Sequence, residues 1–153
     1  MRDQGLFFED FSIGDQFATP GRTVTDAEIT LFAGLSGDFN PLHTDEEFAK
    51  TTPFGRRVAH GVLGLALAIG LSSRLGLFDG TGLAFLGVEW SFRRPIFIGD
   101  TVHVRFTVRD KRPAKKPGGG ILALATELVN QRGEIVQEGS RTYLVRTREG
   151  GAA

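Results

Sequence analysis

The stretch from His60 to Leu75 constrains the fold more than any other part of the chain. It is apolar nearly all round and carries glycines, among them Gly61, Gly64 and Gly70. A helix that is apolar on every side is normally buried on every side. Glycines lower helix propensity but allow other backbone to come close. The sequence therefore predicts a central helix wrapped by a sheet.

The chain beyond Gly82 has the pattern of β-strands. The expected strands are Leu83–Phe92, Thr101–Asp110, Ile121–Asn130 and Glu134–Arg146. From Val102 to Val108 apolar residues occupy every second position, as in a strand with one buried face. The run Gly118–Gly120 is expected to join two strands through a flexible loop. Successive strands with short links indicate an antiparallel sheet, so the predicted fold class is α+β.

A shorter helix is expected near the N-terminus. Thr25 to Glu28 reads Thr-Asp-Ala-Glu, which is a capping box, and apolar residues follow it at helical spacing. Gly34 and Gly37 are expected to end this helix.

The composition is that of a globular chain. Its 153 residues suffice for one domain with a sizeable core and are few for two. Hydrophobic residues at 41% and charged residues at 24% exclude a disordered or collagen-like chain. We therefore expect a single domain over residues 1–153, with a frayed tail from about residue 148 onward.

Charge and residue usage exclude several classes of partner. Lys+Arg and Asp+Glu balance at 18 each, which argues against nucleic acid as a partner. Without cysteine there is no disulfide framework and no thiolate nucleophile. The first residues do not resemble a signal peptide. The longest apolar stretch, Val62–Leu71, is far below the roughly 20 residues that span a bilayer. We expect a soluble, cytoplasmic protein with no membrane span.

Asp38 and His43 are the strongest candidates for chemistry. They flank a short loop whose backbone is restricted by Gly37, Asn40 and Pro41. A carboxylate and an imidazole together can orient and activate a water molecule, because imidazole titrates near neutral pH. An arbitrary Asp and His at this spacing would more often be a turn cap and a loop residue. The surrounding segments decide between these interpretations.

Three segments carry a resemblance to a known family. Phe32–His43, FAGLSGDFNPLH, closely resembles the signature of the (R)-specific enoyl-CoA hydratases, which are MaoC-like dehydratases. Phe54–Gly61, FGRRVAHG, resembles the family's segment entering its central helix. Arg94–Asp100, RPIFIGD, resembles its later strand and turn. The order and spacing of these segments agree from about Phe11 to Arg146.

This resemblance implies a hot-dog fold, in which a curved antiparallel sheet wraps a long helix, usually paired into a homodimer. It implies a hydro-lyase of fatty acid metabolism that adds water reversibly to a trans-2-enoyl thioester. Asp38 and His43 match the family's catalytic pair, which holds one water. Gly61 matches the glycine of the oxyanion site, and a helix start does present unpaired N–H groups. The alternative is that Gly61 only eases packing. Coenzyme A or an acyl carrier protein would carry the substrate, and no further cofactor is implied.

Asn40 and His60 are the remaining candidates, as substrate-binding residues. Asn40 could orient the loop or position Asp38. His60 could line the thioester channel or be a hydrogen-bonded histidine at a helix start. Three histidines without tight spacing, and no cysteine, predict no metal site. One departure concerns 65–70, which lacks a serine that several family members carry and leaves the acyl preference open.

Two other functions stay open from the sequence. A hot-dog thioesterase would use Asp38 to direct water at the thioester carbonyl. A non-catalytic subunit would bind acyl thioesters beside an active partner. The intact pair of Asp38 and His43 favours the hydratase over both.

Overall fold

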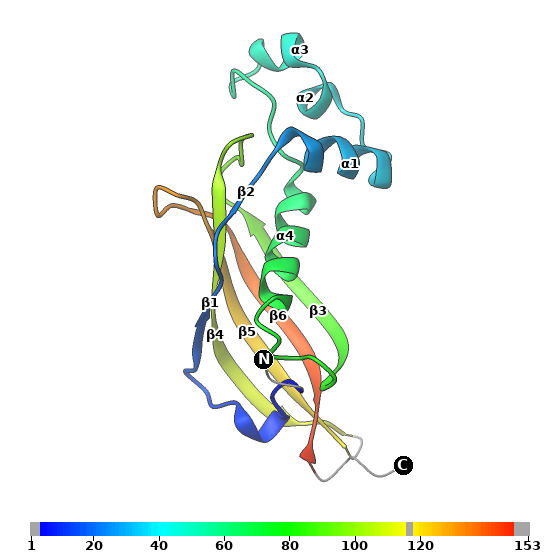
Figure 1. Ribbon diagram of the computed structural model, residues 1–153, viewed down its shortest axis with the longest axis vertical. Coiled ribbons are helices and arrows are strands. Elements are labelled where there is room, and N and C mark those ends of the chain that lie inside the picture. The colour runs from blue at the N-terminus through cyan, green and yellow to red at the C-terminus, as the bar shows by residue number, and fades with distance from the viewer. Residues whose placement is uncertain (1–3, 116–117, 149–153) are drawn as a thin grey trace.

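The computed structural model describes residues 4–115 and 118–148, in which several helices accompany an antiparallel sheet (Figure 1). The helical elements are η1 (Phe8–Asp10), α1 (Asp26–Ser36), α2 (Pro41–Thr44), α3 (Glu46–Lys50) and α4 (Gly61–Ser73). The strands are β1 (Gln16–Ala18), β2 (Arg22–Thr23), β3 (Gly82–Phe92), β4 (Thr101–Pro113), β5 (Gly119–Val129) and β6 (Ile135–Arg146). These elements confirm the predicted α+β class.

The strands pair in the order β1-β4-β5-β6-β3, and β2 pairs with β4 beside that path. Every pairing is antiparallel. In β4 the side chains of Val102, Val104, Phe106 and Val108 are all buried, which confirms the predicted alternation. The hairpin between β5 and β6 turns where Gly133 has a φ of 77°, a conformation that favours glycine. The strand β3 is left at one edge of the sheet.

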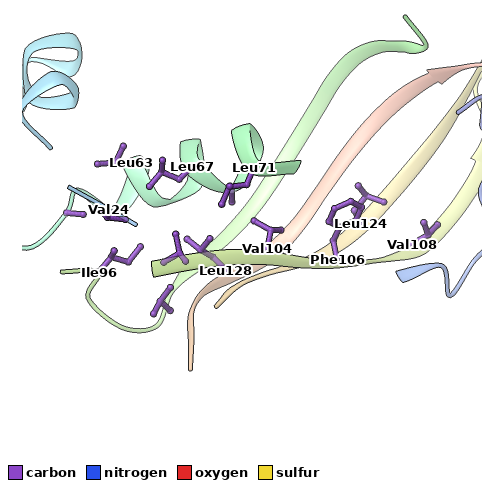
Figure 2. Close-up of a cluster of buried hydrophobic side chains, with 14 of the residues drawn as sticks. Val24, Leu63, Leu67, Leu71, Ile96, Val104, Phe106, Val108, Leu124 and Leu128 are labelled. Carbon is purple, nitrogen blue, oxygen red and sulfur yellow. The ribbon is translucent and has the colours of Figure 1, made fainter. Parts of the chain in front are cut away.

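The helix α4 lies against one face of the sheet (Figure 1). Its side chains Leu63, Leu67 and Leu71 point at the sheet and meet the buried cluster that includes Val104 and Leu128 (Figure 2). Because these positions recur at helical spacing, one stripe of the helix closes the core.

The expectation that this helix is buried on every side is wrong for the single chain. Val62 is 57% exposed, and Gly61 and Gly70 are exposed as well. The physical reason is that a single layer of sheet covers only one side of a helix. The other side remains open although its residues are apolar.

The helix α1 begins as its capping box predicts. Thr25 is the N-cap, and its N–H donates to Oε2 of Glu28 at 2.8 Å. Hydrogen bonds from the Thr25 hydroxyl and from Arg22 lower the pKa of Glu28 from its ordinary 4.5 to about 2. The helix ends at Gly37, which has a φ of 78°. This helix leads directly into the loop that carries Asp38.

The prediction of a flexible loop at Gly118–Gly120 is wrong in part, because Gly119 and Gly120 are residues of β5. A Cβ on Gly120 would lie only 2.1 Å from the ring of Phe8. This glycine therefore permits the close packing of an aromatic ring on the sheet.

The predicted frayed tail falls mostly on residues 149–153, which lie outside the described residues. Its first residue, Arg148, contacts the N-terminal part of the chain. Its guanidinium pairs with Asp10, and its N–H donates to Glu9 at 3.2 Å. Among the described helices, none is long and apolar enough to span a membrane.

We predict that Glu28→Gln weakens the fold at neutral pH but not in strong acid. The pKa of Glu28 is depressed in the folded state, so its contribution is fully present above about 4.5 and is lost as the pH falls toward 2. At pH 7 the loss should be about 1 kcal/mol at most, since solvent screens part of the interaction. Urea unfolding from pH 7 to pH 2 measures it. Glu47→Gln, at an exposed pair with Lys50, is the control. An equal effect of Glu28→Gln at both ends of this range would contradict the prediction.

Candidate functional site

The loop that carries Asp38 is closed by local hydrogen bonds. The left-handed conformation of Gly37 turns the chain out of α1. The N–H of Asn40 donates to Oδ1 of Asp38 at 3.1 Å, and Oδ1 of Asn40 accepts the N–H of Leu42 at 2.9 Å. Asn40 is thus the N-cap of α2, and Pro41 occupies the first helical position. The structure places Asn40 where it supports the loop around Asp38.

The ring of His43 is fixed by one backbone carbonyl. Its Nδ1 lies 2.7 Å from the oxygen of Val58, and a carbonyl oxygen can only accept. Nδ1 therefore carries the proton of the neutral ring, and Nε2 carries the lone pair. That lone pair makes His43 a base on its Nε2 side.

This Nε2 faces the carboxylate of Asp38. The distance from Nε2 to Oδ2 of Asp38 is 4.0 Å, which is longer than a direct hydrogen bond. The two side chains differ in access to solvent, because 53% of the Asp38 side chain is exposed and only 12% of that of His43. An imidazole lone pair and a carboxylate thus converge on one accessible place.

His60 lies behind this pair. Its Nε2 is 2.9 Å from the backbone oxygen of Asp38, so Nε2 carries the proton and donates to that carbonyl. The ring stacks on His43 with centroids 3.9 Å apart and also contacts Phe32. It is buried, at 3% exposure. The structure therefore places His60 as a support for the Asp38 loop, and substrate contact by His60 stays a prediction.

Gly61 is the first residue of α4, and His60 is the N-cap. Its N–H is one of those that a helix start leaves without an intrahelical partner, at the positive end of the helix dipole. A Cβ at this position would lie 3.0 Å from the ring of Phe92. The glycine therefore allows Phe92 to pack directly on the backbone.

Asp38, His43 and His60 also form a group whose potential ligand atoms lie within 4.8 Å of one another. Their arrangement is poorly suited to a metal ion. The rings of His43 and His60 are stacked, and stacked rings are poorly placed to direct in-plane lone pairs at one ion. The geometry suits proton transfer better than chelation.

Sequence reasoning did not identify three side chains around Gly61. Phe92 packs on its Cα, Gln137 donates to its carbonyl oxygen, and Trp90 donates in turn to Gln137. Gln137 could have been noticed in the sequence, because it is a polar residue within a predicted strand. The other two have no signal in a single sequence, because only the fold brings β3 to the start of α4.

Known proteins resemble this chain over most of its length. A family model described as "MaoC like domain" matches residues 10–128. The (R)-specific enoyl-CoA hydratase of Rhodospirillum rubrum is 36% identical over 143 residues, which are 93% of this chain and 93% of that protein. The solved structure of a MaoC-like dehydratase from the same organism, 36% identical, superposes with a TM-score of 0.85 and covers 94% of this chain and 99% of that one.

A Mycobacterium tuberculosis protein with a double hotdog fold is 23% identical and has a TM-score of 0.84. It covers 100% of this chain, which covers 48% of that one. At this identity the similarity concerns the fold alone. It confirms the predicted hot-dog fold.

We predict that His60→Phe destabilises the protein by about 1–2 kcal/mol. Phenylalanine keeps a ring between His43 and Phe32 but cannot donate to the carbonyl of Asp38, which then loses a partly buried hydrogen bond. Urea unfolding at pH 7 measures the change. His103→Phe is the control, because His103 lies on the face of β4 opposite to the buried Val102 and Val104. Equal stability of wild type and His60→Phe would contradict the prediction.

Proposed function

The chain belongs to the MaoC-like hydratase and dehydratase family, and from this premise we propose that it is an (R)-specific enoyl-thioester hydratase. The reaction is the reversible syn addition of water to a trans-2-enoyl thioester. The observation that carries the proposal is the convergence of His43 Nε2 and Asp38 Oδ2 at 4.0 Å. Two groups at this separation can both hydrogen-bond one water, each at about 2.8 Å.

In the proposed reaction the water bound by this pair supplies both added groups. His43 Nε2 has the free lone pair, so it accepts a proton as the water oxygen bonds to C3. A proton is returned from the pair to C2, which gives a net addition of one water. Because both groups stand on the same side of the substrate, the hydroxyl and the proton arrive on one face. The reverse sequence is dehydration of the 3-hydroxyacyl thioester.

Negative charge moves onto the thioester oxygen while C3 is attacked. A donor that is already in place at that oxygen lowers the barrier most, because it needs no reorganisation. We assign this role to the N–H of Gly61 at the positive end of α4. The hydrogen bond from His60 to the loop of Asp38 links this helix start to the acid–base pair. This link supports a single site that contains all three groups.

The substrate in this proposal is an acyl thioester of coenzyme A or of an acyl carrier protein, and the reaction requires no other cofactor. The related protein of R. rubrum is named for the coenzyme A thioester. A cytoplasmic location agrees with such substrates and stays a prediction.

We predict that Asp38→Asn and His43→Ala each lower kcat for hydration of crotonyl-CoA by about 10²–10⁴-fold. Each change removes one proton-handling group, and such groups contribute by factors of this order. Loss of the enoyl absorbance measures the rate, and His103→Ala is the control. Wild-type rates in both variants would end the assignment.

Thiol release and ligand binding, measured beside enoyl absorbance, separate the alternatives. A thioesterase would release free thiol from the acyl thioester, which a thiol reagent detects, while a binding subunit would bind butyryl-CoA without turning over any enoyl-CoA. The proposed hydratase consumes the double bond and releases no thiol. Enoyl-CoAs of graded chain length, and one acyl-carrier substrate, would then define the preference.

We further propose that the chain pairs with a second copy along β3. Among the described residues no strand pairs with its outer edge, and it presents exposed apolar side chains, including Phe85, Val88 and Phe92. The open face of α4, with Val62, adds to this apolar surface. An unprotected apolar edge would otherwise invite nonspecific association. A second copy offers the same edge and can pair with it antiparallel about a two-fold axis.

We predict a dimer by light scattering at micromolar concentration and a shift toward monomer in Val88→Lys. Lysine on an edge strand opposes strand pairing across that edge. Ile13→Lys, which also places a charge at an exposed apolar residue but in a turn, is the control. A monomeric wild type would contradict the proposal.

A further inference from the structure

We infer that Gln137 and Trp90 form a hydrogen-bonded relay that positions Gly61 for the thioester oxygen. The inference rests on the proposed function, because it assigns positioning residues to that reaction. It gives a catalytic consequence to a polar side chain in the core, where such groups are costly unless they are paired. Neither residue belongs to the acid–base pair.

The relay runs from the edge strand of the sheet to the start of the helix. The indole N–H of Trp90, on β3, donates to Oε1 of Gln137 at 2.9 Å. Nε2 of Gln137, on β6, donates to the backbone oxygen of Gly61 at 3.0 Å. Gln137 is only 2% exposed, so water does not compete for its amide.

The indole determines which way the amide faces. An indole nitrogen can only donate, so the amide oxygen must face Trp90 and the amide nitrogen must face the helix. The carbonyl of Gly61 can only accept, and it therefore requires that same orientation. Without Trp90 only the carbonyl of Gly61 would favour this orientation, and the amide would be held less firmly. Trp90 thus acts on Gly61 through Gln137.

The packing around the relay leaves it little freedom. A Cβ on Gly64 would lie 2.2 Å from Nε2 of Gln137, so this glycine makes room for the amide. The ring of Phe92 packs on Gly61, 3.0 Å from the place of a Cβ. Gly61 is therefore held by a hydrogen bond at its carbonyl and by an aromatic ring at its Cα. The carbonyl belongs to the peptide after Gly61 and the N–H to the peptide before it, so the relay acts on that N–H through the Cα of Gly61, which the ring of Phe92 also contacts.

A well-held donor is worth more than a loose one. Stabilisation of an oxyanion depends on donors already aimed at the place where charge develops, and a misplacement of about 1 Å costs up to 10²-fold. Gln137 does not donate to the substrate. Its loss should therefore lower kcat more than it changes KM, since the ground state depends less on this alignment.

The first test is a double-mutant cycle with crotonyl-CoA. We expect Gln137→Met, which keeps the side-chain length, to lower kcat at least about tenfold with KM changed by less than about threefold. We expect Trp90→Phe to lower kcat in the same direction. The double variant should be no slower than Gln137→Met, because both residues act through one hydrogen bond. Unchanged kcat in Gln137→Met, or effects that multiply in the double variant, would overturn the relay.

The second test restores the relay with a conservative change. A protonated glutamic acid in Gln137→Glu can donate to Gly61 and accept from Trp90, whereas the carboxylate can only accept. Burial raises the pKa of such a carboxyl, so protonation is accessible near neutral pH. The ratio of its kcat to that of wild type should rise as the pH falls. The same ratio for Gln137→Met should stay flat, and parallel profiles would count against the relay.

Thr126→Val is the stability control. It removes a buried hydroxyl that accepts from Arg141, and Thr126, on β5, makes no hydrogen bond of the relay. We expect a lower melting temperature with kcat unchanged, because unfolding alone does not act on the helix start. If Thr126→Val and Gln137→Met lower kcat equally at matched stability, the effect of Gln137 is structural and the inference fails.

A last measurement separates this inference from the proposed function. Trp90 is the only tryptophan of the chain, so its indole N–H gives a single proton resonance. Adding butyryl-CoA, which cannot be hydrated, should move that resonance in wild type but not in Gln137→Met. If wild type hydrates no enoyl-CoA, the proposed function fails, and this titration still tests the relay. A resonance that does not move in wild type overturns it.

Discussion

The site depends on two reciprocal hydrogen bonds from histidine rings to backbone carbonyls. His43, on the segment of α1 to α3, donates to the carbonyl of Val58, which precedes α4. His60, at the cap of α4, donates back to the carbonyl of Asp38 in the first segment. Figure 1 shows why such a connection matters, because α1, α2 and α3 lie together beyond the end of the sheet. These bonds also fix the protonated nitrogen of each neutral ring. The same bond from His43 therefore holds the segment in place and leaves the lone pair on Nε2.

The interior under α4 is not uniformly apolar. Arg141 is fully buried, and its guanidinium donates to the hydroxyls of Ser72, Thr126 and Tyr143. Burial lowers its pKa and raises that of Tyr143, because both charged forms lose solvation. Ser72 and Thr126 each donate onward to a backbone carbonyl, so each of these two hydroxyls both accepts and donates a hydrogen bond. The hydrogen bonds of this cluster and of Gln137 require a defined geometry, whereas the apolar contacts around them do not.

Local rules predicted much of this structure, and tertiary contacts account for the rest. The capping box at Thr25 and the alternation in β4 depend on near neighbours in the chain, so sequence alone located them. The open face of α4 could not be foreseen, because helical periodicity does not tell a sheet from a second subunit as the covering layer. The support of Asp38 by His60 was missed for a similar reason. It joins residues 22 positions apart through a backbone carbonyl, which leaves no mark in a side-chain pattern.

Gly61 shows how a packing role and a catalytic role can coincide. The missing Cβ leaves space that the ring of Phe92 fills, so packing alone favours a glycine here. The N–H of the same residue belongs to the open start of α4 and is a separate group. An alanine at this position would displace Phe92 and leave the N–H in place, so loss of activity in such a variant would not identify the oxyanion donor. Variants of Gln137 distinguish the two roles, because Gln137 contacts the carbonyl of Gly61 and does not occupy the space of its missing Cβ. The sheet thus acts on the position of Gly61 from its carbonyl, one peptide unit beyond the N–H, and not through the identity of the residue.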